Sequence, residues 1–143
     1  MRTKRITIQE VEYTAFRLAK KFMEWDEPIP EFGSRFPHAL ESCLGVPFQT
    51  FHRKDLYPGL VKKAAILFYL MIKNHPFENG NKRIAVMTLF WFLYKNGRWL
   101  IVDNQSLYEF AKKIARGEAE RKNDYIQIIE GFLSAGIIRI GKD

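Results

Sequence analysis

Long apolar runs separated by turn residues follow one another along this chain and predict mostly helices. The clearest run covers residues 84–94 and is apolar at nearly every position, which is typical of a helix buried on all sides. Asn81 is the expected cap of this helix and Gly97 its stop. The helix would therefore span roughly Lys82 to Asn96.

The N-terminal third of the chain carries two further helix signals. Thr7 and Glu10 have the spacing of a capping box, which would open a helix that continues to about Trp25. Residues 28–33 are rich in turn-forming residues and predict a connection. A short helix is then expected from Pro37 to Gly45.

The remaining segments complete a mainly helical prediction. We expect a helix from 58 to 74, another from about 104 to 116 and a last one from 123 to 135. Residues 98–102 could form one short extended segment, and the tail at 137–140 either a small strand or a partner-binding edge. The chain is thus predicted to be one domain over residues 1–143, a compact helical bundle.

Composition agrees with a small globular protein. The chain has 143 residues, of which 47% are hydrophobic and 15% aromatic, so it can bury a sizeable core. Its one cysteine, Cys43, cannot form an internal disulfide, which fits a reducing cytoplasm.

Charge and hydropathy indicate where the protein is expected in the cell and which kind of partner it is expected to bind. The N-terminus lacks the apolar stretch of a signal peptide, and the run at 84–94 is too short to cross a bilayer, so we expect a cytoplasmic protein with no membrane contact. The formal net charge of +7 favours acidic partners. Basic pairs such as Lys20-Lys21 lack interleaved aromatic residues, so binding to nucleic acid is not the favoured interpretation.

The polar segment from His75 to Arg83 carries the candidate chemistry. Lys82 and Arg83 fall in the first turn of the predicted helix, where unpaired N–H groups and the helix dipole already favour negative charge. Two cations there are locally unfavourable unless an anion binds, and such a combination is typical of a phosphate site. His75 lies one loop away, where a proton acceptor for an attacking hydroxyl would be needed.

A purely structural interpretation of the same residues stays open at this point. Asn81 could only cap the helix, and Lys82 and Arg83 could only be solvated. A single histidine in a loop at a helix end is more often structural than catalytic.

The whole segment nevertheless resembles the signature of a known family, Fic/Doc, through His75-Pro76-Phe77-x-x-Gly80-Asn81-Lys82-Arg83. Lysine after the asparagine is similar to the Doc, or death-on-curing, branch. The resemblance extends roughly from Pro28 to Ile129. Its upstream part comprises Thr50-Phe51, Asp55-Leu56-Tyr57-Pro58, Lys63-Ala64-Ala65 and Asn74.

This resemblance implies a helical fold with at most a short β flap, and a set of residue roles. His75 would be the general base, and Phe77 would be buried in the core. The cradle for the phosphates of ATP would be Gly80, Asn81, Lys82 and Arg83, with Asn81 on phosphate or metal and Arg83 neutralising the phosphate chain.

The resemblance also implies a reaction. Doc-type toxins transfer the terminal phosphate of ATP to a hydroxyl of elongation factor Tu and are masked by an antitoxin. Classical Fic enzymes instead transfer AMP to a protein hydroxyl. A third interpretation, an inactive basic binding module, also stays open.

Two departures from the family pattern affect these expectations. The position that usually holds a Mg²⁺-binding carboxylate is Asn79, with Glu78 one place earlier, so Asn79 and Asn81 are the candidate metal ligands. The second arginine of the classical signature is replaced by Val86, which points away from AMP transfer.

Residues 46–57 match the family region that forms a flap over the site. Phe48, Thr50 and Phe51 are therefore candidates for docking the target protein, and packing at the edge of the core is the alternative. The chain contains no string similar to the inhibitory helix of self-inhibited Fic proteins, so an inhibitor would be a second protein.

Overall fold

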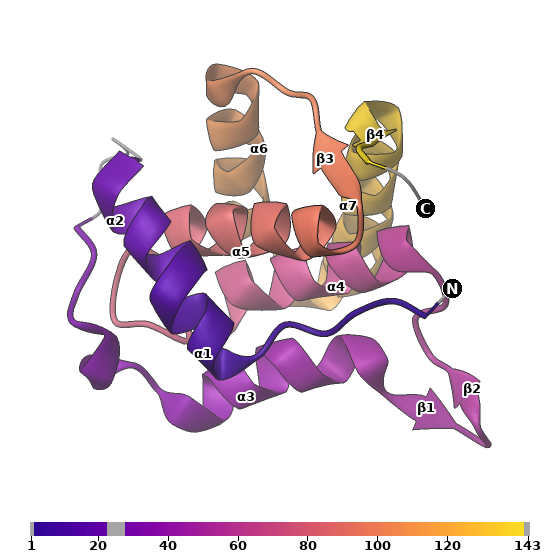
Figure 1. Cartoon of the computed structure of the whole chain (residues 1–143), viewed down its shortest axis with the longest axis horizontal. Coiled ribbons are helices and arrows are strands. Elements are labelled where there is room, and N and C mark those ends of the chain that lie inside the picture. Colours follow the sequence, from indigo (N-terminus) through magenta and orange to yellow (C-terminus); the bar gives the residue numbers. More distant parts are fainter. Residues whose placement is uncertain (1, 23–27, 142–143) are drawn as a thin grey trace.

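The computed structural model describes residues 2–22 and 28–141, and the fold in these residues is mainly helical. Two long helices, α4 (Leu60–Lys73) and α5 (Asn81–Lys95), lie side by side at the centre, and the other helices surround them (Figure 1). The prediction of a mainly α fold with little β structure is confirmed.

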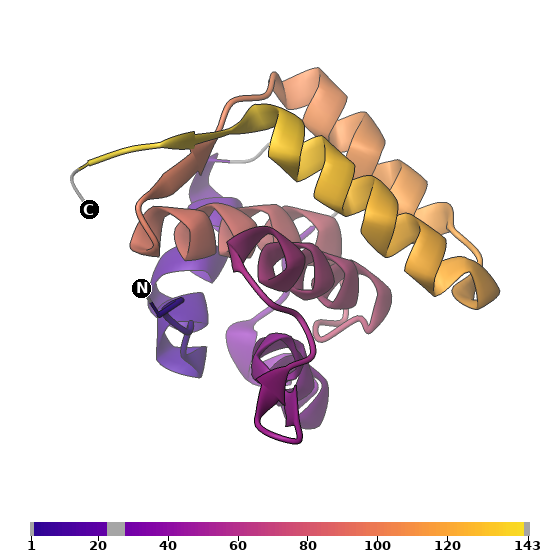
Figure 2. The same ribbon diagram turned by 90° about the vertical axis from the view of Figure 1, so that its right-hand side faces the viewer.

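Helix α4 is central because its apolar residues point in all directions. Ten consecutive residues, from Lys63 to Ile72, are buried, and the helix packs against α5 on one side and against α7 (Lys122–Gly136) on the other. Figure 2 shows α7 running antiparallel to α6 on one side of the central helices. A helix buried all round needs such a layer on each side.

Both central helices begin at positions that differ from the predicted ones. Helix α4 starts at Leu60 rather than at Pro58, because Gly59 at its N-cap has a positive φ of 85°. Helix α5 starts at Asn81, and the N-cap is Gly80, again with a positive φ, of 73°. Asn81 is therefore the first helical residue and not the cap.

The N-terminal helix is built from three pieces, α1 (Ile8–Glu10), a π-helical segment (Val11–Phe16) and α2 (Arg17–Phe22). The predicted capping box is present, with reciprocal hydrogen bonds between Thr7 and Glu10. The predicted end of this helix near Trp25 lies outside the described residues.

Between this helix and α4 the chain forms short elements. A 3₁₀ turn (Phe32–Ser34) precedes α3 (Pro37–Gly45), and a second 3₁₀ turn (Val46–Phe48) follows it. A hairpin then projects beyond the helices (Figure 1). Its two strands, β1 (Thr50–Phe51) and β2 (Lys54–Asp55), have two residues each.

The C-terminal part of the chain, from β3 onward, packs against α4 and α5. Strand β3 (Arg98–Leu100) pairs antiparallel with β4 (Ile137–Arg139). Between these strands the chain forms α6 (Asn104–Arg116), a 3₁₀ turn (Ala119–Arg121) and α7. The predicted strand at the tail is thus present. Within residues 2–22 and 28–141, no helix is long and apolar enough to cross a membrane.

The Glu10 carboxylate fastens the N-terminal segment to α5. It accepts hydrogen bonds from Lys95 Nζ at 2.7 Å, from Trp91 Nε1 at 2.8 Å and from the Thr7 backbone N–H at 3.0 Å. Burial raises the pKa of Glu10, but these three donors together hold the pKa below the ordinary value of 4.5. The network therefore stabilises the fold while the carboxylate is ionised.

We predict that Glu10→Gln lowers the free energy of unfolding by about 1 kcal/mol near neutral pH, because it weakens the bond to the Lys95 ammonium group. Since the folded-state pKa is the lower one, this difference is fully present above pH 4.5 and is lost as the pH falls through the folded-state pKa. Urea unfolding of wild type and variant at about pH 7 and about pH 3 measures it. Glu41→Gln on α3, where the carboxylate is exposed, is the control. An equal difference at both pH values contradicts the prediction.

Candidate functional site

The connection between α4 and α5 presents His75 at the end of a rigid helix. Asn74 is the C-cap of α4, and its N–H still donates to the Leu70 carbonyl at 2.9 Å. His75 follows with a positive φ of 46° and is exposed. A non-glycine residue in this conformation is uncommon and is often found at functional positions. The structure thus places the predicted base at the surface, directly after a buried helix.

Phe77 anchors the middle of this connection in the core. Its ring is 1% exposed and packs against the rings of Phe16 and Phe32, with centroid distances of 5.7 Å and 5.8 Å. Burial of this ring, which the family resemblance implied, is confirmed. The three rings come from three separate segments of the chain, so the connection is held from several directions.

The Asn81 side chain closes the connection from inside. Its Oδ1 accepts from the Phe77 backbone N–H at 3.0 Å, and its Nδ2 donates to the Phe77 carbonyl at 2.9 Å. Asn81 is 7% exposed, so both bonds are shielded from water. The amide that the sequence assigned to phosphate or metal contact therefore satisfies buried backbone groups of the loop.

The segment 28–36 borders the same connection, which the sequence did not predict. A Cβ added to Gly80 would lie 2.9 Å from the Ile29 side chain and 3.0 Å from the Pro28 carbonyl oxygen, so only glycine fits there. The Phe36 N–H donates to the Pro76 carbonyl at 2.8 Å. Each of these contacts joins residues at least 40 positions apart in the chain, so no local spacing could have indicated them.

Lys82 and Arg83 occupy the first turn of α5, as predicted, but their surroundings differ. Lys82 is half-buried, whereas Arg83 is 8% exposed and one of its terminal nitrogens donates to the Ala19 carbonyl of α2 at 2.7 Å. The Arg83 guanidinium group therefore reaches back to the N-terminal helix. This is a structural contact for a residue that the sequence assigned to phosphate alone.

Of the two predicted metal ligands, Asn81 is buried in the connection, whereas Asn79 lies on its exposed side. Glu78 and Asn79 are both exposed, and the Asn79 Oδ1 accepts from the Gly80 N–H at 3.0 Å. In the part of the chain that the structure describes, no group of three or more His, Cys, Asp or Glu residues is placed to hold a metal ion.

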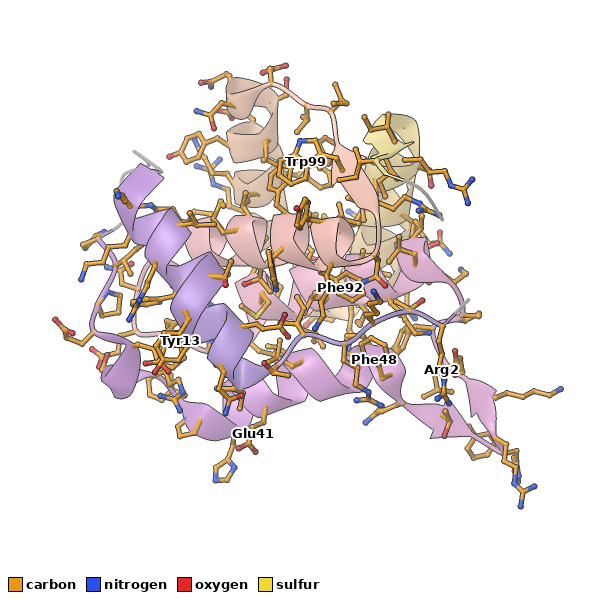
Figure 3. All side chains as sticks on the ribbon, in the orientation of Figure 1. Arg2, Tyr13, Glu41, Phe48, Phe92 and Trp99 are labelled. Carbon is orange, nitrogen blue, oxygen red and sulfur yellow. The ribbon has the colours of Figure 1, made fainter. Side chains whose placement is uncertain are left out.

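Phe48, Thr50 and Phe51 lie at the opposite end of α4 from His75. The hairpin precedes the first residue of α4 and the connection follows the last, so the length of a 14-residue helix, about 20 Å, separates them (Figure 1). Phe48 is half-buried and packs edge-on against Phe92, with the ring centroids 6.2 Å apart. Both residues are labelled in Figure 3. The structure therefore does not bring these three residues to the candidate site.

The C-terminal part of the chain also supports the connection. Lys73, two residues before His75, donates to the carbonyls of Ala115 at 3.1 Å and Gly117 at 2.7 Å. These carbonyls belong to the last turn and the C-cap of α6. The end of α4 is thus fixed from α6 as well as from α5.

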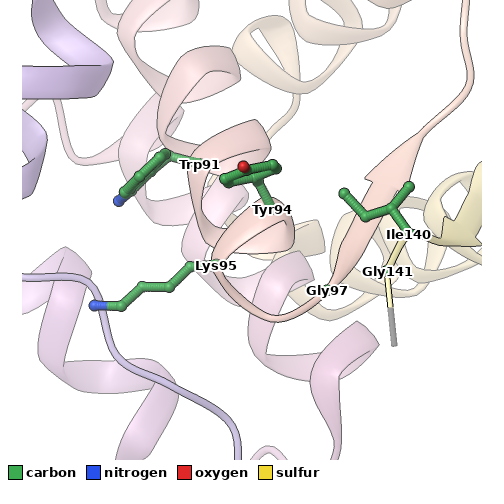
Figure 4. Close-up of a pocket in the computed structure, with 6 residues that line it drawn as sticks. All are labelled: Trp91, Tyr94, Lys95, Gly97, Ile140 and Gly141. Atoms are coloured by element: carbon green, nitrogen blue, oxygen red, sulfur yellow. The ribbon is translucent and has the colours of Figure 1, made fainter. Parts of the chain in front are cut away.

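A pocket of about 540 Å³ lies at the other end of α5. It is lined by Trp91, Tyr94, Lys95, Gly97, Ile140 and Gly141 (Figure 4). These residues belong to the last turns of α5, the glycine after it and the C-terminal tail. His75 precedes the first residue of α5, so the pocket lies at the other end of this helix from His75. We do not include it in the candidate site.

Comparison with known proteins identifies related sequences. A model of the Fic/DOC family matches residues 5–93. Toxin Doc of Mycolicibacterium smegmatis is 38% identical over 64 residues, which are 45% of this chain and 49% of that protein. The match thus spans about half the length of this curated relative. No solved structure matches.

We predict that Asn81→Ala lowers the free energy of unfolding by about 2 kcal/mol, because it leaves the buried N–H and carbonyl of Phe77 without their partner. Asn79→Ala removes an exposed amide two residues earlier in the chain and should lower the free energy of unfolding by less than about 0.5 kcal/mol. Urea unfolding measures both, and hydrogen exchange of the Phe77 N–H locates the change. Equal costs for the two variants contradict the role given to Asn81.

Proposed function

This chain belongs to the Fic/DOC family, and from that premise we propose that it is a Doc-type toxin that transfers the γ-phosphate of ATP to a hydroxyl group of a target protein. The similarity to Toxin Doc supports the toxin assignment. Elongation factor Tu is the target that the family resemblance points to, and its modification would block translation in the cytoplasm.

The observation that carries the proposal is the position of His75. It is exposed, it follows a helix that is buried along ten consecutive residues, and its backbone is held in a rare conformation. A general base has to be accessible and fixed at once, and this arrangement supplies both.

In the proposed step the oxygen of the target hydroxyl attacks the γ-phosphorus of ATP. The bond between that phosphorus and the β–γ bridging oxygen breaks, ADP leaves, and His75 takes the proton of the hydroxyl. Positioning and charge neutralisation supply most of the catalysis in phosphoryl transfer, and one base beside a cationic helix terminus suits this chemistry.

The first turn of α5 is the proposed phosphate cradle. The N–H groups at the start of this helix and the side chain of Lys82 favour an anion there. Asn81 and Arg83 serve this cradle mainly by holding the loop and the N-terminal helix in place, because their side chains donate to Phe77 and Ala19. Val86 is 1% exposed at the position of the second family arginine, which favours kinase chemistry over AMP transfer.

Magnesium would accompany the nucleotide and use few protein ligands. The amide oxygens of Asn79 and Asn81 each already accept a hydrogen bond from the loop, so they fit a metal poorly as its main ligands. Glu78 is the one carboxylate between His75 and Arg83, and it is exposed. It is the residue that we propose would contact the ion.

The proposed target segment docks along residues 28–36, which border the connection through Ile29 and Phe36. The inhibitor is proposed to be a small antitoxin protein that covers the same region. We further propose that residues 1–143 form a single domain, because α6 and α7 pack directly on α4.

We predict that the purified chain labels a protein in a bacterial lysate from ATP carrying label at the γ-phosphate and not from ATP labelled at the α-phosphate. His75→Asn should lower the labelling rate by at least about 100-fold, because it removes the base while asparagine tolerates the positive φ. His38→Asn is the matched control, since the His38 side chain is fully exposed on α3.

The alternatives give different patterns in the same experiment. Label from the α-phosphate indicates AMP transfer, and no label from either position indicates an inactive binding module. Equal rates for wild type and His75→Asn overturn the role of the base.

A further inference from the structure

The segment 28–36 brings a cation to the candidate site that the proposed chemistry does not use. The segment meets Gly80, the N-cap of α5, near its beginning and the Pro76 carbonyl at its end, and it runs along the connection on the same side of the molecule (Figure 1). Arg35 directly precedes Phe36, whose N–H donates to the Pro76 carbonyl at 2.8 Å. The Arg35 backbone is therefore fixed against the residue that follows the proposed base.

The guanidinium group of Arg35 covers the aromatic cluster that anchors the connection. Its Cζ lies 4.4 Å from the centroid of the Phe32 ring. Phe32 is 8% exposed, and its ring packs against the Phe77 ring with a centroid distance of 5.8 Å. Arg35 itself is half-buried, so it borders both this cluster and the solvent.

This guanidinium group has more hydrogen-bond donors than acceptors around it. In the part of the chain that the structure describes, its one hydrogen bond runs from an Nη atom to the Phe32 carbonyl at 3.4 Å, which is long for such a bond. The Nε atom is buried and has no partner among the described residues. A buried donor without an acceptor is costly, and in native proteins it is often explained by a ligand or ion that supplies the acceptor.

The proposed phosphate cradle has less positive charge to offer than the sequence predicted. Arg83 is 8% exposed and already donates to the Ala19 carbonyl at 2.7 Å. The position of the second family arginine holds Val86, which is 1% exposed. Because charge neutralisation supplies much of the catalysis in phosphoryl transfer, a further cation from outside α5 would complete the cradle.

We propose that Arg35 is this cation and that its guanidinium group binds the terminal phosphate of ATP through two parallel N–H···O bonds. The inference rests on the proposed function for the identity of the phosphate. A planar guanidinium fork matches two phosphate oxygens, which a lysine ammonium group does not, and it stays charged throughout the reaction. The long bond to the Phe32 carbonyl is the protein contact that Arg35 gives up when it turns toward the phosphate.

Calorimetric titration tests the contact without the transfer step, using Mg²⁺ with either ADP or AMP-PNP, an ATP analogue that is not cleaved between the β- and γ-phosphates. Arg35→Gln should weaken binding of AMP-PNP by about tenfold and binding of ADP by less than about twofold, because ADP lacks the phosphate that Arg35 contacts. Arg35→Lys should recover part of the affinity. Arg5→Gln is the matched control, since the Arg5 Cζ lies 4.5 Å over the Phe48 ring, at the other end of α4 from His75.

A purely structural role of Arg35 gives a different pattern. Arg35→Met keeps an unbranched side chain over the Phe32 ring and removes the charge, so urea unfolding should resemble that of wild type while AMP-PNP affinity falls as in Arg35→Gln. If Arg35→Met binds AMP-PNP as tightly as wild type, the contact with phosphate is overturned. Equal losses of AMP-PNP and ADP affinity in Arg35→Gln overturn it too.

Labelling separates this inference from the proposed function. Arg35→Gln should lower the rate of γ-phosphate transfer at saturating ATP by at least about 100-fold, as for other arginines that neutralise a transferring phosphoryl group. A wild-type chain that labels its target no faster than Arg35→Gln supports the function and contradicts the inference. A chain that labels nothing, yet binds AMP-PNP in an Arg35-dependent way, contradicts the function and supports the phosphate contact.

Discussion

The two hydrogen bonds between the Asn81 amide and the Phe77 backbone are the contact on which the candidate site depends. They join the start of α5 to the middle of the connection and let the chain turn between two buried helices with its polar groups satisfied. Phe77 can then enter the core beside Phe16 and Phe32, and Asn74 can end α4. His75 lies between these two fixed points, Asn74 before it and Phe77 after it, and is held at the surface by them.

Features with a local cause could be predicted from the sequence. The buried helix α5 follows from its apolar run, the capping box from Thr7 and Glu10, and the place of His75 at a helix end from the preceding apolar helix. The family signature added the burial of Phe77. In each case the deciding residues lie within one helix or one turn of each other.

Features that depend on distant contacts could not be predicted. The contact of Arg83 with Ala19 joins residues 64 positions apart, and the segment 28–36 reaches the loop only after the chain has folded. The docking role of the hairpin stays a prediction, and one helix length separates the hairpin from the loop. The turn at His52 and Arg53 also lacks the glycine or asparagine by which such hairpins are predicted from sequence.

The contact of Lys73 with the end of α6 has a consequence for how this protein can be divided. The match of the family model ends at residue 93, inside α5, yet Lys73 and the outer side of α4 contact α6 and α7. A fragment that stops at the shared segment would leave one side of α4 without its cover. Ile129 and Leu133 of α7 are both buried, so they belong to the cover that such a fragment would lack.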